Sequence, residues 1–448
     1  MNSILSNAPE TELREEIRQI CRSQVLTHIL PFWLSAARSD GSIPPRVDPA
    51  GISHPDASRG LVMISRLLWT FSRLNTILNE APDQKSPEGT ALFSGLLESA
   101  EQIRNIMRWA KETLTSGFRD GEHEGFFWTI TPEGRPDQSH KQMYGQAFAL
   151  YGMSEYLKAE DDPEVLELCH RTFDLIHNRG QDAEYRGYWD ACSRDWTPQE
   201  DVSLSDADIP CAKSMNTHLH ILEAFSCYAQ MLRMRGSFSG GSSTRDSRSG
   251  TVTHALEELV SLHLQKITHR DSGHLQLYFT RDWKAIGAPN SFGHDIEAFW
   301  LIREAMEILP SELDPNPISP GPEQLFTAAV QGLRSFEAQL PDAARRLELS
   351  CMINETHEGT EDSSRIWWVQ AEAAAGLGEA WRMHKERSTL EQLWRIINFI
   401  EHVQTSALGE WHWRTDEYNQ PDTSRDMAGM WKTPYHNVRA MLEVLHRI

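Results

Sequence analysis

The sequence predicts an all-α protein folded as an (α/α)6 barrel with short β-hairpins at one end. Apolar residues recur at spacings of three and four along most of the chain, and this period is typical of amphipathic helices. Between the helices, a glycine, alternating aromatic residues and a polar turn recur, which indicates a short β-hairpin. Gly125 and Gly187 begin two such units 62 residues apart. A repeat of this length holds two helices and a hairpin, so the chain is expected to close into a ring of helix pairs.

About twelve helices are expected. In one of them, Ile64, Leu67, Leu68 and Phe71 fall on a single stripe. In chain order, the predicted helical stretches cover residues 11–36, 64–78, 96–107, 144–156, 163–178, 219–232, 253–267, 291–308, 322–338, 364–384, 388–403 and 432–447. No long strand-like run lies between them. Six antiparallel pairs of helices give the barrel, and an irregular α-solenoid is the alternative.

The hairpins are expected to gather at one end of the barrel and to wall a cavity. Four units begin at Gly125, Gly187, Gly273 and Gly409, and residues 349–353 are a candidate degenerate unit in the wide last gap. We treat residues 1–448 as a single catalytic domain. The Ser- and Gly-rich stretch at about 236–251 reads as a flexible insertion, and the Pro- and Gly-rich stretch 310–322 reads as a surface linker.

Composition excludes several classes of function. The formal net charge of −21 repels phosphate backbones, so nucleic acid is not an expected partner. No apolar run approaches the length of a membrane span, and the first residues lack the apolar core of a signal peptide. The six cysteines form no Cys-x-x-Cys pair, and scattered single cysteines are typical of a reducing compartment. We therefore expect a cytoplasmic protein that does not contact membranes.

Three motifs place histidines beside polar or aromatic neighbours. Imidazole is the side chain whose ordinary pKa suits both the donation and the removal of protons near neutrality. His218 and His220 point in nearly opposite directions on a helix, so they are unsuited to chelate one metal ion. Asn216 shares the face of His220, which favours His220 as functional and His218 as a packed or hydrogen-bonded residue.

The second motif contains His294 and Glu297, which share a helix face, so the carboxylate can orient the imidazole, raise its pKa or contact substrate. The third, Trp431 to His436, reads as a loop that enters the last helix. For both motifs a structural role is the alternative, as capping pair or as helix N-terminal punctuation.

A fourth motif, Trp367-Trp368 followed by Glu372, combines an aromatic stacking surface with a carboxylate. Adjacent residues cannot both face inward, so one tryptophan is expected to pack against the wall. Arg66 lies on a strongly apolar helix and needs a partner there, either in a structural ion pair or on a sugar oxygen. No phosphate-binding loop, Ser-His-Asp signature or His-Glu-x-x-His motif is present.

Taken together, six strings resemble the N-acylglucosamine 2-epimerase superfamily, and within it the cellobiose (mannobiose) 2-epimerases. The strings are SRLLWTFS (65–72), YGQAFALY (144–151), SMNTHLHILEA (214–224), SFGHDIEAFWL (291–301), WWVQAEA (367–373) and WKTPYHN (431–437). The resemblance spans nearly the whole chain. The insertion and the linker depart from the compact pattern of the family, and this affects contacts at the rim.

The resemblance implies reversible epimerisation at C2 of a reducing-end sugar, without a redox cofactor or an essential metal. It implies that His294 and His436 transfer protons and that His220 is a third active-site histidine. The implied substrate-contacting residues are Arg66, Tyr144, Asp208, Asn216, Glu297, Trp367, Trp368, Glu372 and Trp431. A base removes the C2 proton of the open-chain aldose to give a cis-enediolate, and an acid on the other face returns a proton. Arg66 and His220 are candidates to stabilise the oxyanion.

Other functions remain open on the sequence. Return of the proton to C1 would make an aldose–ketose isomerase acting on mannose, and an N-acylglucosamine 2-epimerase is a further alternative. A glycoside hydrolase or lyase of the same fold would use carboxylates, and a barrel that only binds carbohydrate or protein is the non-catalytic reading. The expected partner is a mono- or disaccharide, and the chain is expected to be a monomer or a homodimer.

Overall fold

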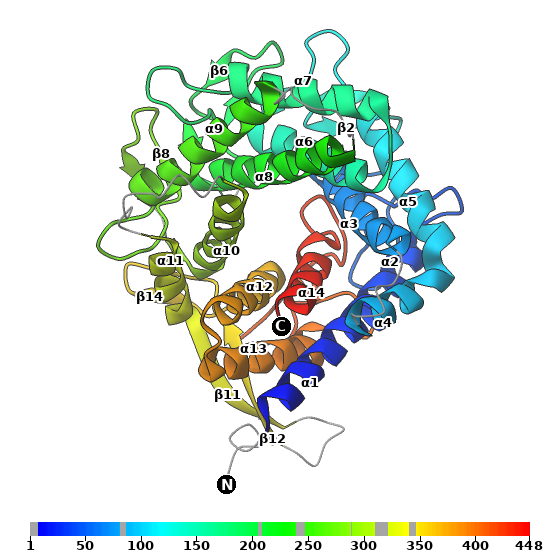
Figure 1. The fold of residues 1–448 in the computed structure, drawn as a ribbon, viewed down its shortest axis with the longest axis vertical. Helices are drawn as coiled ribbons and strands as arrows, with labels where there is room; N and C mark the ends of the chain where they lie inside the picture. Colours follow the sequence, from blue (N-terminus) through cyan, green and yellow to red (C-terminus); the bar gives the residue numbers. More distant parts are fainter. Residues whose placement is uncertain are drawn as a thin grey trace.

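The computed structural model shows a closed ring of helices (Figure 1). The structure describes residues 8–80, 87–204, 208–238, 247–287, 289–309, 321–339 and 346–448. Most of the predicted insertion and linker therefore lies outside the described residues. In the described part, six helices form an inner ring: α3 (Leu61–Asn79), α6 (Met143–Ala159), α8 (Met215–Phe238), α10 (Phe292–Ile308), α12 (Trp367–His384) and α14 (Tyr435–Arg447).

An outer layer of helices surrounds this ring. Its members are α1 (Glu10–Ser23), α2 (Leu30–Ala36), α4 (Pro87–Leu96), α5 (Ala100–Glu112), α7 (Pro163–Arg179), α9 (Ser247–Leu262), α11 (Pro322–Ala329) and α13 (Arg387–Phe399). Short 3-10 or π turns extend several of them: η2 (Gln24–Ile29), η3 (Leu97–Ser99), η4 (Thr113–Gly117), η5 (His263–Ile267), η6 (Val330–Gly332) and η7 (Ile400–Gln404).

Contacts between neighbouring helices close the ring. Each inner helix packs on the next one in chain order, and α14 packs back on α3. Each also packs on an outer helix, as α6 does on α7 and α14 on α1 (Figure 1). This double layer is the predicted (α/α)6 barrel, and solved structures of similar proteins share it, as described below.

The core follows from these two layers. Inner helices such as α6 are buried on nearly every side and are apolar almost all round, whereas outer helices such as α5 and α13 carry one apolar face. None of the described helices combines the length and the apolar character that crossing a lipid bilayer requires.

Short strands tie the repeats together at one end of the barrel. The strands are β1 (Arg59–Gly60), β2 (Thr129–Ile130), β3 (Pro136–Gln138), β4 (Lys141–Gln142), β5 (Ala191–Cys192), β6 (Pro198–Gln199), β7 (Lys213–Ser214), β8 (Tyr278–Phe279), β9 (Ala285–Ile286), β10 (Asn290–Ser291), β11 (Leu333–Gln339), β12 (Arg346–Met352), β13 (Glu355–His357), β14 (Thr360–Asp362), β15 (Arg365–Ile366) and β16 (Arg414–Thr415). The strand just before an inner helix pairs antiparallel with a strand of the next hairpin, as β4 does with β5 and β7 with β8. The hairpins therefore surround the N-terminal ends of the inner helices, as predicted.

Buried ion pairs fasten the hairpins to these strands. The Nζ atom of Lys141 lies 2.9 Å from Asp120, that of Lys213 lies 3.0 Å from Asp182, and that of Lys432 lies 3.0 Å from Glu410. All three lysines are fully buried. Removing one partner would leave an uncompensated charge in the interior, so each pair requires its hairpin to stay docked.

Two expectations about this fold are wrong. Residues 322–338 do not form one helix, because α11 ends at Ala329 and the chain continues as strand β11. There are also longer strands than expected, since β11 and β12 are seven residues each and pair along their length. Residues 349–353, the candidate degenerate hairpin unit, lie largely in β12. A Cβ at Gly332 would lie 2.4 Å from the Cγ atom of Phe292, so this glycine allows the turn to pack against α10.

Candidate active site

The site residues occupy equivalent positions on the inner helices. The second residues of four of these helices are Tyr144, Asn216, Trp368 and His436, and the sixth residues of four are Arg66, His220, Glu297 and Glu372. Residues four apart lie on one face of a helix. The ring therefore brings the predicted residues together near the hairpin end of the barrel, although they are far apart in sequence.

His436 is held by a carboxylate. Its Nδ1 atom lies 2.6 Å from Oε1 of Glu372, and the imidazole is 5% exposed. The other carboxylate oxygen of Glu372 accepts a hydrogen bond of 3.0 Å from Nε1 of Trp300. Because an ionised carboxylate only accepts hydrogen bonds, Nδ1 of His436 carries the proton and Nε2 is left for substrate.

His220 is held in the same way. Its Nδ1 atom lies 2.8 Å from Oε2 of Glu223, three residues further along α8. The other oxygen, Oε1, accepts a hydrogen bond of 2.5 Å from the hydroxyl of Tyr435. The ring of His220 packs 4.8 Å from Phe148. The sequence pointed to His220 but not to Glu223, for which the signal was its i+3 spacing.

His294 has a different environment. Its Nδ1 atom lies 2.9 Å from the hydroxyl oxygen of Ser291, and its imidazole is half-buried. It also lines a pocket of about 30 Å³ together with Asp208 and Asn216. This histidine therefore has a neutral partner, whereas His220 and His436 have carboxylates.

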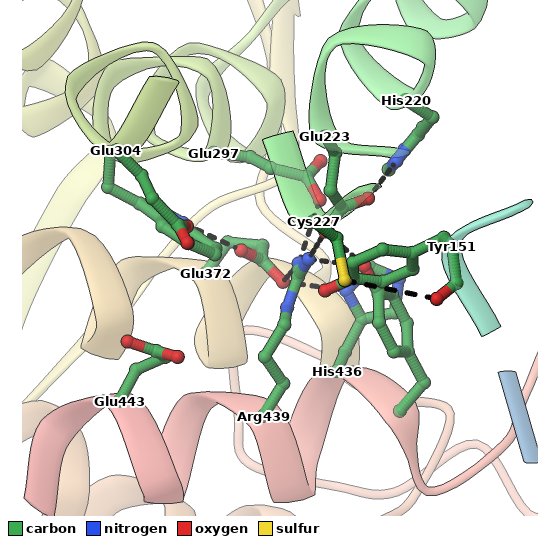
Figure 2. A network of polar contacts seen from close by, with 12 residues as sticks. Tyr151, His220, Glu223, Cys227, Glu297, Glu304, Glu372, His436, Arg439 and Glu443 are labelled. Atoms are coloured by element: carbon green, nitrogen blue, oxygen red, sulfur yellow. Dashed lines mark hydrogen bonds and ion pairs between the residues drawn. The ribbon is translucent and has the colours of Figure 1, made fainter. Parts of the chain in front are cut away.

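His294 and Glu297 do not bond to each other, so of the roles considered for Glu297 the orientation of His294 is not seen. Glu297 instead accepts a hydrogen bond of 3.1 Å from Nη2 of Arg439, which sequence reasoning missed. The same Nη2 atom donates to Oε1 of Glu372 at 2.7 Å, and Nη1 donates to Glu223. Figure 2 shows Arg439 among these three carboxylates.

Burial and charge set the protonation states of these groups. Burial lowers the pKa of His436 to about 3 and that of His294 to about 4, against an ordinary 6.5. Burial alone would raise the pKa of Glu223 and Glu372, but the guanidinium of Arg439 lowers both to about 2. At neutral pH the free site thus holds neutral imidazoles, which can act as bases, beside ionised carboxylates.

Glu297 behaves differently from the other two carboxyl groups. Burial, followed by the nearby charge of Glu372, raises its pKa well above the ordinary value. Two carboxylates that share one guanidinium repel each other, so one of them keeps its proton more readily. Glu297 therefore holds a proton more readily than Glu223 or Glu372 does.

The two adjacent tryptophans divide as expected. Trp367 is 2% exposed and its ring lies beneath the Nζ atom of Lys432, so it packs against the wall. Trp368 is half-buried, and its ring lies 4.8 Å from His294 and 6.0 Å from His436. The indole of Trp368 therefore lies near both imidazoles.

Arg66 has polar partners that carry no charge. It donates to the hydroxyl of Tyr144 at 2.9 Å and to the carbonyl of Trp431 at 3.0 Å. Its guanidinium also lies 4.5 Å from the centre of the Phe148 ring. Trp431 is half-buried, 6.0 Å from Tyr144. Of the two roles predicted for Arg66, the structural ion pair is absent from the described residues.

Three further residues singled out in the sequence are Asn216, Asp208 and His218. The Oδ1 atom of Asn216 is buried without a hydrogen-bond partner among the described residues. Asp208 accepts a hydrogen bond of 2.7 Å from Tyr278. His218 is fully buried, with Nδ1 donating to the carbonyl of Ser214 and Nε2 accepting from the amide of Tyr188, so its predicted structural role is confirmed.

One group of side chains has the composition of a metal site. Potential ligand atoms of Glu297, Glu372 and His436 all lie within 4.8 Å of one another. The guanidinium of Arg439 already contacts both carboxylates there. A metal ion would have to displace this fixed positive charge, so the donor set fits an arginine-bridged pair better than a cation site.

Similar proteins define the class to which this architecture belongs. The N-acylglucosamine 2-epimerase (GlcNAc 2-epimerase) family matches residues 92–440. A cellobiose 2-epimerase from Bacteroides fragilis is 31% identical over 96% of this chain and 99% of its own length. One from Dictyoglomus turgidum is 32% identical over 96% of this chain and 99% of its own length. The solved structure of cellobiose 2-epimerase from Spirochaeta thermophila is 33% identical, covers 97% of each chain and has a TM-score of 0.78.

The chain therefore belongs to the N-acylglucosamine 2-epimerase family. It is a sugar 2-epimerase, an isomerase that acts on a saccharide.

Proposed function

We propose that the protein inverts C2 of the reducing-end aldose of a β-linked disaccharide of the cellobiose or mannobiose type, which converts a glucose unit to mannose. The observation that carries this proposal is the position of Trp368, whose indole lies 4.8 Å from His294 and 6.0 Å from His436. A sugar presents apolar C–H faces that stack on an indole. A sugar ring stacked there would lie close to both imidazoles.

The proposed reaction needs only proton transfers. One of His294 and His436 removes the proton from C2 of the open-chain aldose, and the electrons of that C–H bond form a cis-enediolate. The other histidine, which carries a second ring proton as an imidazolium in the substrate complex, gives that proton to the opposite face of C2 and becomes neutral, and the carbonyl re-forms. Arg66 donates hydrogen bonds to the developing oxyanion. His220 can do so only as an imidazolium, because the proton on its Nδ1 atom is bonded to Glu223. The two catalytic histidines exchange roles in the reverse direction.

The other predicted residues have proposed roles in binding. Asn216 has a free amide oxygen beside His294, which supports a contact with a sugar hydroxyl. Tyr144, Asp208 and Trp431 are proposed to line the same space. Glu297 is proposed to donate a hydrogen bond to substrate from its neutral carboxyl group. For Trp367 and Glu372 the protein contacts support positioning rather than direct contact with substrate.

The disaccharide substrate is proposed from the relatives, each described as a cellobiose 2-epimerase. A monosaccharide substrate, or return of the proton to C1 to give a ketose, are the alternatives. We also propose that residues 1–448 form one catalytic domain and that it acts in the cytoplasm. Its six cysteines are free and buried, which supports a reducing compartment.

The test is incubation of the purified protein with cellobiose, mannobiose, glucose, mannose and N-acetylglucosamine in heavy water, followed by NMR. We expect the C2 epimer of a disaccharide, with deuterium at C2. A ketose product would support the isomerase, and a shortened sugar would support a hydrolase. His294→Ala and His436→Ala should each lower turnover by about 10² to 10⁴-fold while the fold is kept. Near-normal activity in either variant would contradict the assignment.

A further inference from the structure

Arg439 is a buried cation at the centre of a network of carboxylates, two of which hold active-site histidines. It is 1% exposed, and its guanidinium contacts carboxylates from three other inner helices, namely Glu223 of α8, Glu297 of α10 and Glu372 of α12 (Figure 2). Its guanidinium carbon also lies 4.8 Å from the ring centre of Trp300. A buried cation needs such compensation, because leaving water is costly for an ion.

Two of these carboxylates hold histidines as well. Oε2 of Glu223 accepts from Nδ1 of His220, and Oε1 of Glu372 accepts from Nδ1 of His436. A continuous path of hydrogen bonds therefore runs from one imidazole through Glu223, Arg439 and Glu372 to the other imidazole. Each imidazole in this path keeps its Nδ1 proton and leaves Nε2 for chemistry.

We propose that Arg439 is the positioning residue that joins His220 and His436 in one frame and fixes both in the Nδ1-protonated tautomer. This inference rests on the proposed epimerase chemistry, in which Nε2 of His436 exchanges a proton with C2. Arg439 itself does not touch substrate in this arrangement. It acts through the two carboxylates.

The charged groups around Arg439 support this role. The titratable groups near Arg439 include Tyr151 from α6, Glu223 and His220 from α8, Glu297 from α10, Glu372 from α12, and Tyr435 and His436 from α14, with Arg66 of α3 beyond the Tyr435 ring. Without Arg439, three buried carboxyl groups lose their main positive partner. At least one more of them would then take up a proton, and a protonated Glu372 holds the imidazolium of His436 poorly.

The first experiment is independent of activity. Nitrogen-15 NMR of the imidazoles in the wild-type protein reports which ring nitrogen carries the proton. We expect Nδ1-protonated His220 and His436. An Nε2-protonated tautomer at either histidine would overturn the proposal, whether or not any variant folds and whether or not the protein epimerises sugars.

The second experiment uses Arg439→Ala with added guanidinium ion, at a concentration well below that which unfolds the protein. We expect kcat/KM for cellobiose to fall by about 10² to 10⁴-fold, mainly through kcat, because proton transfer is impaired. Guanidinium should restore part of kcat, and the pH profile of kcat should shift in Arg439→Lys. If wild type turns over no sugar, the proposed function fails. The NMR result would still show whether His220 and His436 are held in the Nδ1-protonated tautomer.

Arg447→Ala is the matched control. Arg447 lies on the same helix and packs 5.1 Å from the same Trp300 ring, but its partners are Glu379 and Glu443. It should keep near-normal kcat/KM and show no response to guanidinium. Near-normal activity of a folded Arg439→Ala protein, or an equal response of both variants to guanidinium, would overturn the proposal.

Discussion

Single residues hold the two proposed catalytic imidazoles in unequal ways. His436 has an ionised carboxylate, Glu372, on its Nδ1 atom, while His294 has the hydroxyl of Ser291. A carboxylate stabilises the imidazolium that forms when a histidine accepts a proton, and a hydroxyl does so only weakly. The two histidines are thus unequal bases, and the balance between them depends on Glu372.

Two of the three glutamates beside Arg439, Glu372 and Glu297, should respond differently to amide substitution. Glu372→Gln removes an ionised acceptor, so we expect a fall of about 10² to 10³-fold in kcat/KM, from the loss of the charge that supports proton transfer. The pKa of Glu297 is raised by burial and by the charge of Glu372, so Glu297→Gln should remove less charge than Glu372→Gln does. We expect its loss in kcat/KM to be about tenfold or less, which is the contribution of one hydrogen bond. Steady-state kinetics on both variants measure this ratio. A larger loss in Glu297→Gln would show that Glu297 acts in its ionised form.

The tryptophan pair offers a second contrast between neighbouring residues. Trp368→Ala should lower kcat/KM with little change in the melting temperature, because its half-buried ring is available for stacking. Trp367→Ala should lower the melting temperature strongly, since deleting a buried tryptophan costs about 3 to 5 kcal/mol. Both quantities are measured on the same preparations. Equal losses of stability in the two variants would refute the stacking role of Trp368.

Chelation should leave the enzyme active. The one group of described side chains with metal-ligand spacing is bridged by Arg439, which takes the place of a cation. Turnover of the proposed substrate should therefore be unchanged after treatment with EDTA and desalting. A loss of activity that a divalent ion restores would contradict this expectation and support a metal-dependent isomerase.

Sequence reasoning found the histidines but not all of their partners. His220, His294 and His436 stand out because each lies in a distinctive local string. Arg439 and Glu223 lie 216 residues apart, and their contact depends on closure of the ring rather than on any local pattern. The i+3 spacing that links His220 to Glu223 also links His294 to Glu297, yet only the first pair bonds, because Nδ1 of His294 is bonded to Ser291 instead.

At the scale of elements, the sequence predicts the helices better than the strands. The apolar stripes locate the inner helices to within a few residues, because burial on that face is what makes each helix stable. The error at 322–338 has a physical reason: Leu325, Ala328 and Ala329 follow a helical period, but pairing with β12 takes over from Leu333. Strand pairing between distant segments leaves no period in a single segment.

The glycines that open the hairpins are expected to be more sensitive than ordinary turn glycines. Gly187 has a φ of +72°, and a Cβ there would lie 2.5 Å from the Trp283 ring and 2.7 Å from Nε2 of His218. Gly134 has a φ of +79° with open space around it. Gly134→Ala should cost about 1 to 2 kcal/mol from the backbone alone. Gly187→Ala should cost more, seen as a larger fall in melting temperature; equal falls would show that the neighbours relax.

The stability of the whole molecule in acid depends on opposing groups. Burial lowers the pKa of His263 to about 4 from 6.5, while burial raises the pKa of Asp190 to about 6. A histidine with a lowered pKa takes up its proton only in the unfolded chain, so its contribution to stability is full above pH 6.5 and is lost as the pH falls toward 4. A carboxyl group with a raised pKa has the opposite effect.

Replacement of His263 isolates one of these contributions. His263 is fully buried, and His263→Phe keeps a ring of similar shape but cannot be protonated. When the pH falls from about 7 to about 4.5, the free energy of unfolding should decrease by about 2 kcal/mol less in the variant than in wild type. Denaturant unfolding at both pH values measures this change. His254→Gln, at an exposed position, is the control, and an unchanged difference between the two pH values would contradict the argument.

Closure of the ring has a consequence for the kinetics of folding. Neighbouring helices can dock soon after they form, but α3 must meet α14 across most of the chain, and Arg66 reaches the carbonyl of Trp431 over 365 residues. Contacts of high sequence separation form slowly, because the entropy of the intervening chain is lost before they stabilise anything. We therefore expect refolding to restore helical circular dichroism first and catalytic turnover later, at the rate at which the two ends of the ring meet.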